Sequence, residues 1–115
     1  MVESLVANGG RWFPPGVADL EHGQGFTSDQ LTGLVNRSRP HPGGTITQPA
    51  RLGRPLGAQR ATFIQCTMSN PQLPQAAAAL RDEPKWRFVR LDTGHWPMFT
   101  AAPALAEILA GAAVD

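Results

Sequence analysis

A histidine in a glycine turn is the part of this sequence best suited to chemistry. His95 follows Asp92-Thr93-Gly94, and this turn itself follows an apolar run over residues 86–91. In open sheets of parallel strands, ligands and reacting groups gather where strands end and helices begin. An imidazole at such a place can move a proton near neutral pH. We therefore take His95 as the candidate reacting residue, against the alternative of a structural loop histidine.

Two residues could act as a nucleophile beside this histidine. Cys66 lies inside a run rich in strand-forming residues, and Ser69 lies in the connection that follows it. A free cysteine within a strand is usually a small buried hydrophobic residue. Ser69 lacks the strained turn that exposes a serine nucleophile, so a role as a connector or helix-capping residue is the alternative. Both residues stay secondary candidates.

The composition bounds the classes of protein to which the chain can belong. The chain has 115 residues and a formal charge of +1, so it fits one domain and is not basic enough for nucleic acid or an anionic membrane surface. We find no apolar run near the roughly 20 residues that a membrane helix needs. The first ten residues lack the features of a signal peptide, so we expect a cytoplasmic protein.

Metal and cofactor sites are not expected. His22, His41 and His95 are far apart in the sequence, and Cys66 is the single cysteine, which excludes an internal disulfide. The turn Gly23-Gln24-Gly25 lacks the longer spacing of a phosphate-binding loop. We therefore predict no bound metal or cofactor.

The second half of the chain, residues 61–115, has the pattern of an α/β unit. Residues 62–67 and 86–91 are rich in strand-forming residues, and residues 75–82, with four consecutive alanines, predict a helix between them. Pro103 suits the first turn of a final helix. Its apolar stripe consists of Ala104, Leu105, Ile108 and Leu109. A strand, helix and strand in this order form a parallel pair.

The first half, residues 1–60, is rich in loops because most of the 12 glycines and 11 prolines lie there. Short helices are expected near residues 2–8 and 28–37, the second with Thr27 as N-cap in a capping box. Residues 40–44 are expected to be irregular and residues 45–49 extended. The first helix begins without a cap, so we interpret it as the end of a longer helix.

The second half resembles the C-terminal part of the α/β-hydrolase fold. The resemblance rests on TFIQCT (62–67), the alanine-rich helix and WRFVRLDTGHWPMFTAAPALAEIL (86–109), and PHPGGTITQPARL (40–52) resembles the end of the cap segment. It is closest to the esterase branch that includes plant methyl-ester hydrolases and hydroxynitrile lyases. The resemblance implies a partial α/β-hydrolase fold preceded by a cap-like segment over residues 1–60. It also implies that His95 is the catalytic general base toward a small-molecule ester-like substrate.

The chain departs from the family at the other catalytic positions. No G-x-S-x-G nucleophile elbow occurs in it. The family's acid follows the strand that ends near Thr67, where this chain has Met68, Ser69 and Asn70. The candidate substitutes for the acid are Asn70, whose amide cannot offset the charge of an imidazolium, and Asp92. The resemblance therefore implies an incomplete serine esterase with little hydrolysis of its own.

Four aromatic or soft side chains are candidates for lining a substrate pocket. Trp96 and Met98 follow the histidine directly, and Trp12 and His41 lie in the cap-like segment. Alternatively, Trp96 and Met98 pack against the final helix and line no pocket. Alternatively, Trp12 and His41 are residues that would pack on a part of the family's fold that this chain lacks.

A non-enzymatic function is the rival hypothesis. A two-stranded parallel sheet leaves both edges open and offers little apolar surface to bury. Open edges are templates for pairing with another chain. The chain would then be a truncated remnant that acts as a self-associating interaction module.

Overall fold

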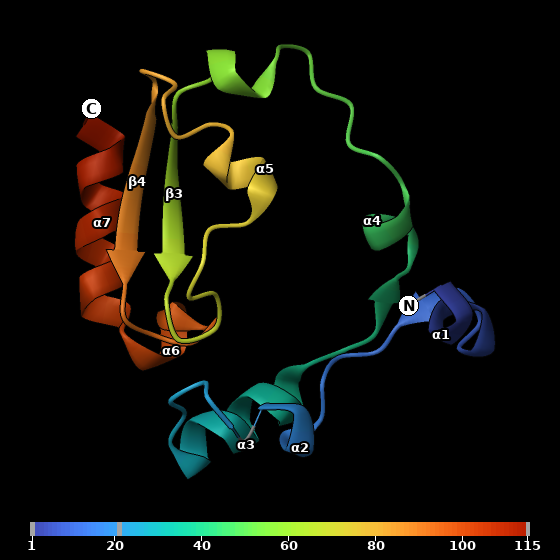
Figure 1. The fold of residues 1–115 in the computed structure, drawn as a ribbon. Helices are drawn as coiled ribbons and strands as arrows, with labels where there is room; N and C mark the ends of the chain where they lie inside the picture. Colours follow the sequence, from blue (N-terminus) through green and yellow to red (C-terminus); the bar gives the residue numbers. More distant parts are fainter. Residues whose placement is uncertain (1, 21, 115) are drawn as a thin grey trace. The chain divides into compact units, whose positions relative to one another are not determined.

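The computed structural model describes residues 2–20 and 22–114, which mix short helices with small sheets (Figure 1). A parallel pair of strands is the largest sheet among them, so the chain is α/β in the loose sense. The elements, in chain order, are α1 (Val2–Ala7), β1 (Arg11–Trp12), α2 (Val17–Leu20), α3 (Ser28–Arg37), β2 (His41–Pro42), α4 (Gly44–Thr47), a 3-10 turn (Leu56–Ala58), β3 (Ala61–Cys66), α5 (Gln75–Ala78), β4 (Trp86–Leu91), α6 (Pro97–Thr100) and α7 (Ala102–Val114).

The described residues divide into two compact units. Unit 1 comprises those of Met1–His22 and Thr27–Arg51, and unit 2 those of Gly23–Phe26 and Leu52–Asp115. Segment 23–26 therefore belongs with the second half of the chain, although the first half surrounds it in sequence. Each unit is described by itself below.

Unit 2 is built on the predicted parallel strand pair. β3 and β4 run side by side over six residues each, with Ala61 opposite Trp86 and Cys66 opposite Leu91. The prediction is confirmed for β4 at both ends, and β3 begins and ends one residue earlier than expected. On one face of the pair, the rings of Phe63 and Phe88 lie 5.6 Å apart. Cross-strand aromatic contacts of this kind stabilise strand pairs.

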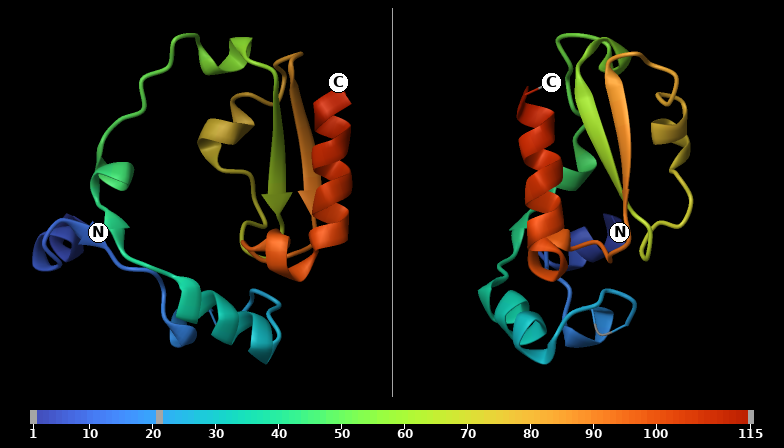
Figure 2. Two further views of the ribbon diagram at one scale, coloured as in Figure 1. Left: turned by 180° about the vertical axis from the view of Figure 1, so that it is seen from behind. Right: turned by 90° about the vertical axis from the view of Figure 1, so that its left-hand side faces the viewer.

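Helices flank both faces of this strand pair. α7 and α5 lie on opposite sides of it in the right-hand view of Figure 2. The final helix is confirmed, with Pro103 in its first turn. The expected helix over 75–82 is wrong beyond its first turn, since α5 ends at Ala78 and the chain continues in turns. After α5 the backbone N–H groups donate three residues back, Leu80 to Ala77 at 3.0 Å and Arg81 to Ala78 at 3.2 Å, so tight turns replace the α-helical pattern.

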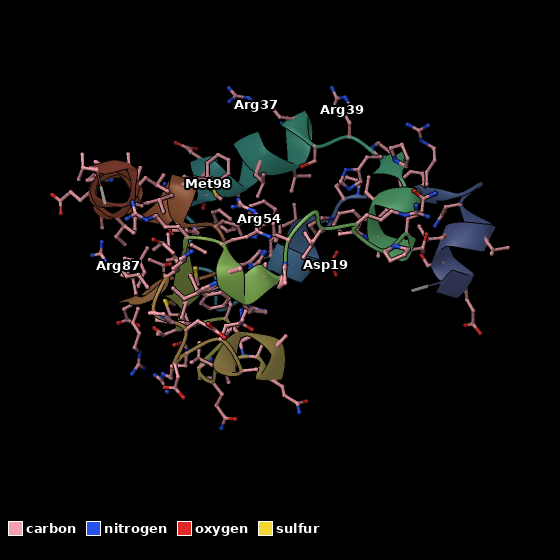
Figure 3. All side chains as sticks on the ribbon, turned by 90° about the horizontal axis from the view of Figure 1, so that it is seen from above. Asp19, Arg37, Arg39, Arg54, Arg87 and Met98 are labelled. Atoms are coloured by element: carbon pink, nitrogen blue, oxygen red, sulfur yellow. The ribbon has the colours of Figure 1, made fainter. Side chains whose placement is uncertain are left out.

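Unit 1 contains the predicted capped helix. α3 spans Ser28–Arg37, as expected. The Thr27 hydroxyl accepts a bond from the Gln30 backbone N–H at 3.2 Å, and the Gln30 side chain accepts one from the Thr27 N–H at 3.0 Å. Figure 3 shows the Arg37 and Arg39 side chains extending outward near the end of this helix. The capping-box prediction is therefore confirmed. Helix α1 also forms but ends at Ala7, one residue short.

Residues 40–49 differ from the prediction. The expected irregular segment contains β2, which pairs antiparallel with β1 over two residues. The expected extended segment instead begins with a helical turn, α4. The hydroxyl groups of Thr45 and Thr47 donate to the carbonyls of Pro42 and Gly43, at 2.8 and 3.3 Å, and this back-bonding favours a turn over a strand.

Both units have thin cores. The buried apolar side chains of the described chain are Leu5 and Leu20 in unit 1 and Ala77 and Pro97 in unit 2, and none of the described side chains is less than 2% exposed. Large apolar side chains such as Met68, Met98 and Leu109 are half or more exposed. Contacts along the backbone and between half-buried side chains therefore hold each unit.

Candidate functional site

The turn between β4 and α6 is fixed by backbone hydrogen bonds to the end of β3. The N–H of Thr67 donates to the carbonyl of Leu91 at 3.0 Å, and the N–H of Met68 donates to that of Thr93 at 3.0 Å. Thr93 and Gly94 are buried, and Pro97 is buried at the start of α6. The residues between Leu91 and Pro97 therefore follow a defined path at the carboxyl ends of both strands.

His95 stands on this path with an exposed side chain. Its backbone N–H donates to Oε1 of Gln24 at 2.7 Å. Its ring meets the ring of Trp96 edge-on, with centroids 5.6 Å apart and an interplanar angle of 89°. Within residues 2–20 and 22–114, no side chain hydrogen-bonds the imidazole. The main chain of His95 is thus anchored while its ring is oriented by an aromatic contact.

The Asp92 carboxylate is engaged with β3. Its Oδ1 accepts a hydrogen bond of 2.8 Å from the hydroxyl of Thr67, and the residue is exposed. This bond links the ends of the two strands. The structure therefore gives this carboxylate a partner other than the His95 ring.

Asn70 and His95 line one hollow of about 440 Å³. The backbone N–H of Asn70 donates to the Cys66 carbonyl at 2.9 Å, and its carbonyl accepts from Nε2 of the buried Gln65 at 2.8 Å. These two bonds fix the main chain of Asn70 next to the end of β3. Of the two candidate substitutes for the acid, Asn70 is the one that shares this hollow with the histidine.

The same hollow has a mainly apolar lining. Met98, which extends from α6 in Figure 3, is part of it, together with the half-buried Cys66. The remaining lining residues are Phe63, Ile64, Gln65, Pro97 and Leu105. The structure thus brings four of the sequence-predicted candidates around one space, namely Cys66, Asn70, His95 and Met98.

The other candidates lie elsewhere or have other contacts. The Ser69 hydroxyl donates to Oε1 of Gln24 at 3.3 Å. Trp96 contacts the His95 ring but is not part of the lining of the hollow. Trp12 and His41 belong to unit 1, where their rings stack at 4.7 Å across the β1–β2 pair. Each of these two rings therefore has the other as its packing partner.

Sequence reasoning missed Gln24, the residue in direct contact with the His95 backbone. Its neighbours Gly23 and Gly25 have φ angles of 73° and 76°, a backbone region that favours glycine. The G-Q-G pattern therefore predicted a tight turn, but nothing in it indicated a contact 71 residues along the chain. Such a pairing depends on the tertiary fold and leaves no local signal.

The described residues contain neither a cluster of metal-ligating side chains nor a membrane-spanning helix. Across the described residues, no group of three or more His, Cys, Asp or Glu side chains is placed to hold a metal ion. None of the helices in that part of the chain has the length and apolar character to cross a membrane. No family model, curated protein or solved structure matches the chain.

Proposed function

We propose that unit 2 is the C-terminal part of an α/β-hydrolase fold in which His95 is the general base for hydrolysis of an ester or similar carbonyl compound. The observation that carries the proposal is the position of His95. It follows the second of two parallel strands, on an anchored turn, beside a mainly apolar hollow. This is the region of a parallel sheet where reacting groups gather.

The chemistry assigned to this chain is proton transfer. The imidazole would take the proton of a serine hydroxyl as that oxygen attacks the carbonyl carbon, and would return it to the leaving alcohol. The serine and the oxyanion-hole donors would come from polypeptide beyond these 115 residues. The hollow beside His95 offers apolar surface for the substrate, since Ile64, Met98 and Leu105 line it.

The test begins with the reading frame upstream of the gene segment. We expect it to encode a strand followed by G-x-S-x-G, and the longer product to hydrolyse p-nitrophenyl esters. In that product, His95→Ala should lower kcat/KM by about 10²–10⁴-fold, the usual contribution of a general base. The matched control is His22→Ala, which removes an exposed histidine of unit 1. A frame without the elbow, or an unchanged rate for His95→Ala, would refute the proposal.

A second candidate function is self-association, and the exposed apolar surface favours it. The backbone N–H of Ala61 donates to the Lys85 carbonyl, and that of Thr67 donates to the Leu91 carbonyl. The backbone N–H groups of the odd-numbered residues of β3 therefore point toward β4. The alternation of a parallel ladder then turns the amides of Thr62 and Ile64 toward the other edge. An uncharged strand edge beside exposed apolar side chains is a template for a second copy of the chain.

Light scattering across a dilution series tests this second candidate. We expect the apparent mass to rise with concentration. Thr62→Lys, which places a charge on β3, should lower that rise, since edge lysines block pairing between sheets. The matched control is Thr32→Lys, on the exposed side of α3 in unit 1. A constant monomer mass at high concentration, together with a cooperative melt, would exclude self-association.

A further inference from the structure

Gln24 makes contacts that single it out from the rest of its turn. Its Oε1 accepts two hydrogen bonds, one from the His95 backbone N–H at 2.7 Å and one from the Ser69 hydroxyl at 3.3 Å. An amide oxygen has two lone pairs, so both are occupied. One atom thus joins the turn that carries His95 to the connection that follows β3.

The backbone of Gln24 also lies against the same turn. A Cβ atom at Gly94 would lie 2.6 Å from both the Cα and the carbonyl oxygen of Gln24. Side chains do not approach backbone this closely, so the contact requires glycine at position 94. Two residues further along, the rings of Phe26 and Phe99 lie 6.3 Å apart and connect the segment to α6.

We infer that Gln24 is the positioning residue of His95, holding the main chain of the histidine turn so that the imidazole stays at the hollow. The inference rests on the proposed role of His95 as a base. It assigns part of the site to segment 23–26, far from the histidine in sequence. It also gives the Ser69 hydroxyl a structural role, because its proton is donated to Gln24 and not to an imidazole.

The first experiment measures His95 directly by NMR in the 115-residue chain. Gln24→Met keeps the length of the side chain and removes the acceptor. We expect the His95 amide to exchange with solvent about fivefold to tenfold faster, the effect of losing one hydrogen bond. The separation between the His95 ring and the Leu105 methyl groups should also change, because both residues line the same hollow. Amides of β4 should keep their exchange rates.

Two variants and two controls make the result specific. Gln24→Glu retains acceptor oxygens and should restore slow exchange, whereas Gly94→Ala should reproduce the effect of Gln24→Met by displacing the segment. Gln72→Met changes an exposed glutamine on the connection after β3 and should have no effect. Gly111→Ala also should have none, because its Cβ would meet its nearest neighbour, an Arg87 nitrogen, at an ordinary 3.5 Å.

Two outcomes would overturn the inference. In one, Gln24→Met leaves the exchange of the His95 amide and the separation of its ring from the Leu105 methyl groups unchanged. In the other, it accelerates β4 amides as much as His95, which would mean a role in stability alone. In the longer gene product, positioning predicts a lower kcat with an unchanged KM for Gln24→Met. Loss of the proposed base function would appear separately, as full activity of His95→Ala with the NMR effects of Gln24→Met intact.

Discussion

Units 1 and 2 differ in the number of residues that their strand pairs join. In unit 1, the longest helix is fixed by a capping box within four residues, and its sheet pairs only two residues on each strand. In unit 2, six residues of β3 pair with six of β4, and Gln24 reaches His95 across 71 positions. Yet both units bury very few side chains. Regular secondary structure is therefore not evidence of a deep core in this chain.

The comparison predicts that each unit can be weakened without the other. The capped helix α3 of unit 1 depends on single side chains near its N-terminus, whereas the β3–β4 pair of unit 2 depends on side chains from both strands. The predictions that follow test this separation, in order of decreasing expected effect.

The largest effect is expected from Phe88→Ala in unit 2. The centroid of the Phe88 ring lies 5.6 Å from that of Phe63 on β3 and 6.1 Å from that of Trp86 on β4. Removing the ring therefore removes aromatic contacts with both strands. Fully buried Phe→Ala changes cost about 3–5 kcal/mol, and for this half-buried ring we expect about 2 kcal/mol. Urea unfolding gives the free energy. Hydrogen exchange should show faster β3 and β4 amides and unchanged α3 amides.

Leu109→Ala is the matched control for Phe88→Ala, since Leu109 is 56% exposed on α7. We expect a change within about 0.5 kcal/mol, as is usual for surface sites. If Phe88→Ala also accelerated exchange in α3, the two units would be one cooperative structure and the comparison would fail.

A smaller effect is expected from Thr27→Ala in unit 1. The change removes the hydroxyl that accepts the Gln30 N–H and should cost about 1 kcal/mol, confined to α3. Thr32→Ala, an exposed position inside the same helix, should be neutral or slightly stabilising because alanine is the better helix former. Hydrogen exchange of α3 amides separates the two variants. Equal losses in both would mean that the cap contributes nothing.

How much the sequence predicted depends on whether the signal for each feature is local. The capping box over Thr27–Gln30 and the strand over Trp86–Leu91 were predicted correctly because their signals are local. The early end of α5 and the helical α4 were missed, because the chain changes to tighter turns after Ala78 and because threonine hydroxyls bond back to carbonyls near α4. Both errors arose from hydrogen bonds between residues close together in the sequence.

The candidate site was predicted less completely than the fold. The position of His95 after a strand followed from the pattern of residues 86–95, and Asn70 was a candidate because it lies just after residues 62–67. Gln24 was not a candidate, because a glutamine between two glycines has no preferred partner in the sequence. The bond between Asp92 and Thr67 was equally hidden, since either strand alone gives no indication of it.

A third, weaker effect is expected at the ends of the paired strands. Thr67→Val removes the hydroxyl that donates to Asp92 at 2.8 Å. Because the pair is exposed, we expect a loss of about 0.5 kcal/mol, the low end for a hydrogen bond. Asp92→Asn keeps an acceptor oxygen and should lose less. Urea unfolding of both variants provides the measurement. A loss larger than that of Phe88→Ala would mean that this bond, and not the aromatic contacts, holds the strands.

The smallest effect is expected from His95→Ala on ester hydrolysis by the 115-residue chain alone. In the described residues, no nucleophile donates to the imidazole, and the Ser69 hydroxyl donates to Gln24 instead. The sequence has no elbow serine, and one oxyanion-hole donor alone is typically worth about 2.7–4 kcal/mol of transition-state stabilisation. Turnover of p-nitrophenyl acetate should therefore stay near that of an inert protein of equal mass, with or without His95. Clear turnover that His95→Ala abolishes would mean that unit 2 holds its own nucleophile. Cys66→Ala and Ser69→Ala would then identify it, and Cys66 would be the first to test because it lines the hollow with His95.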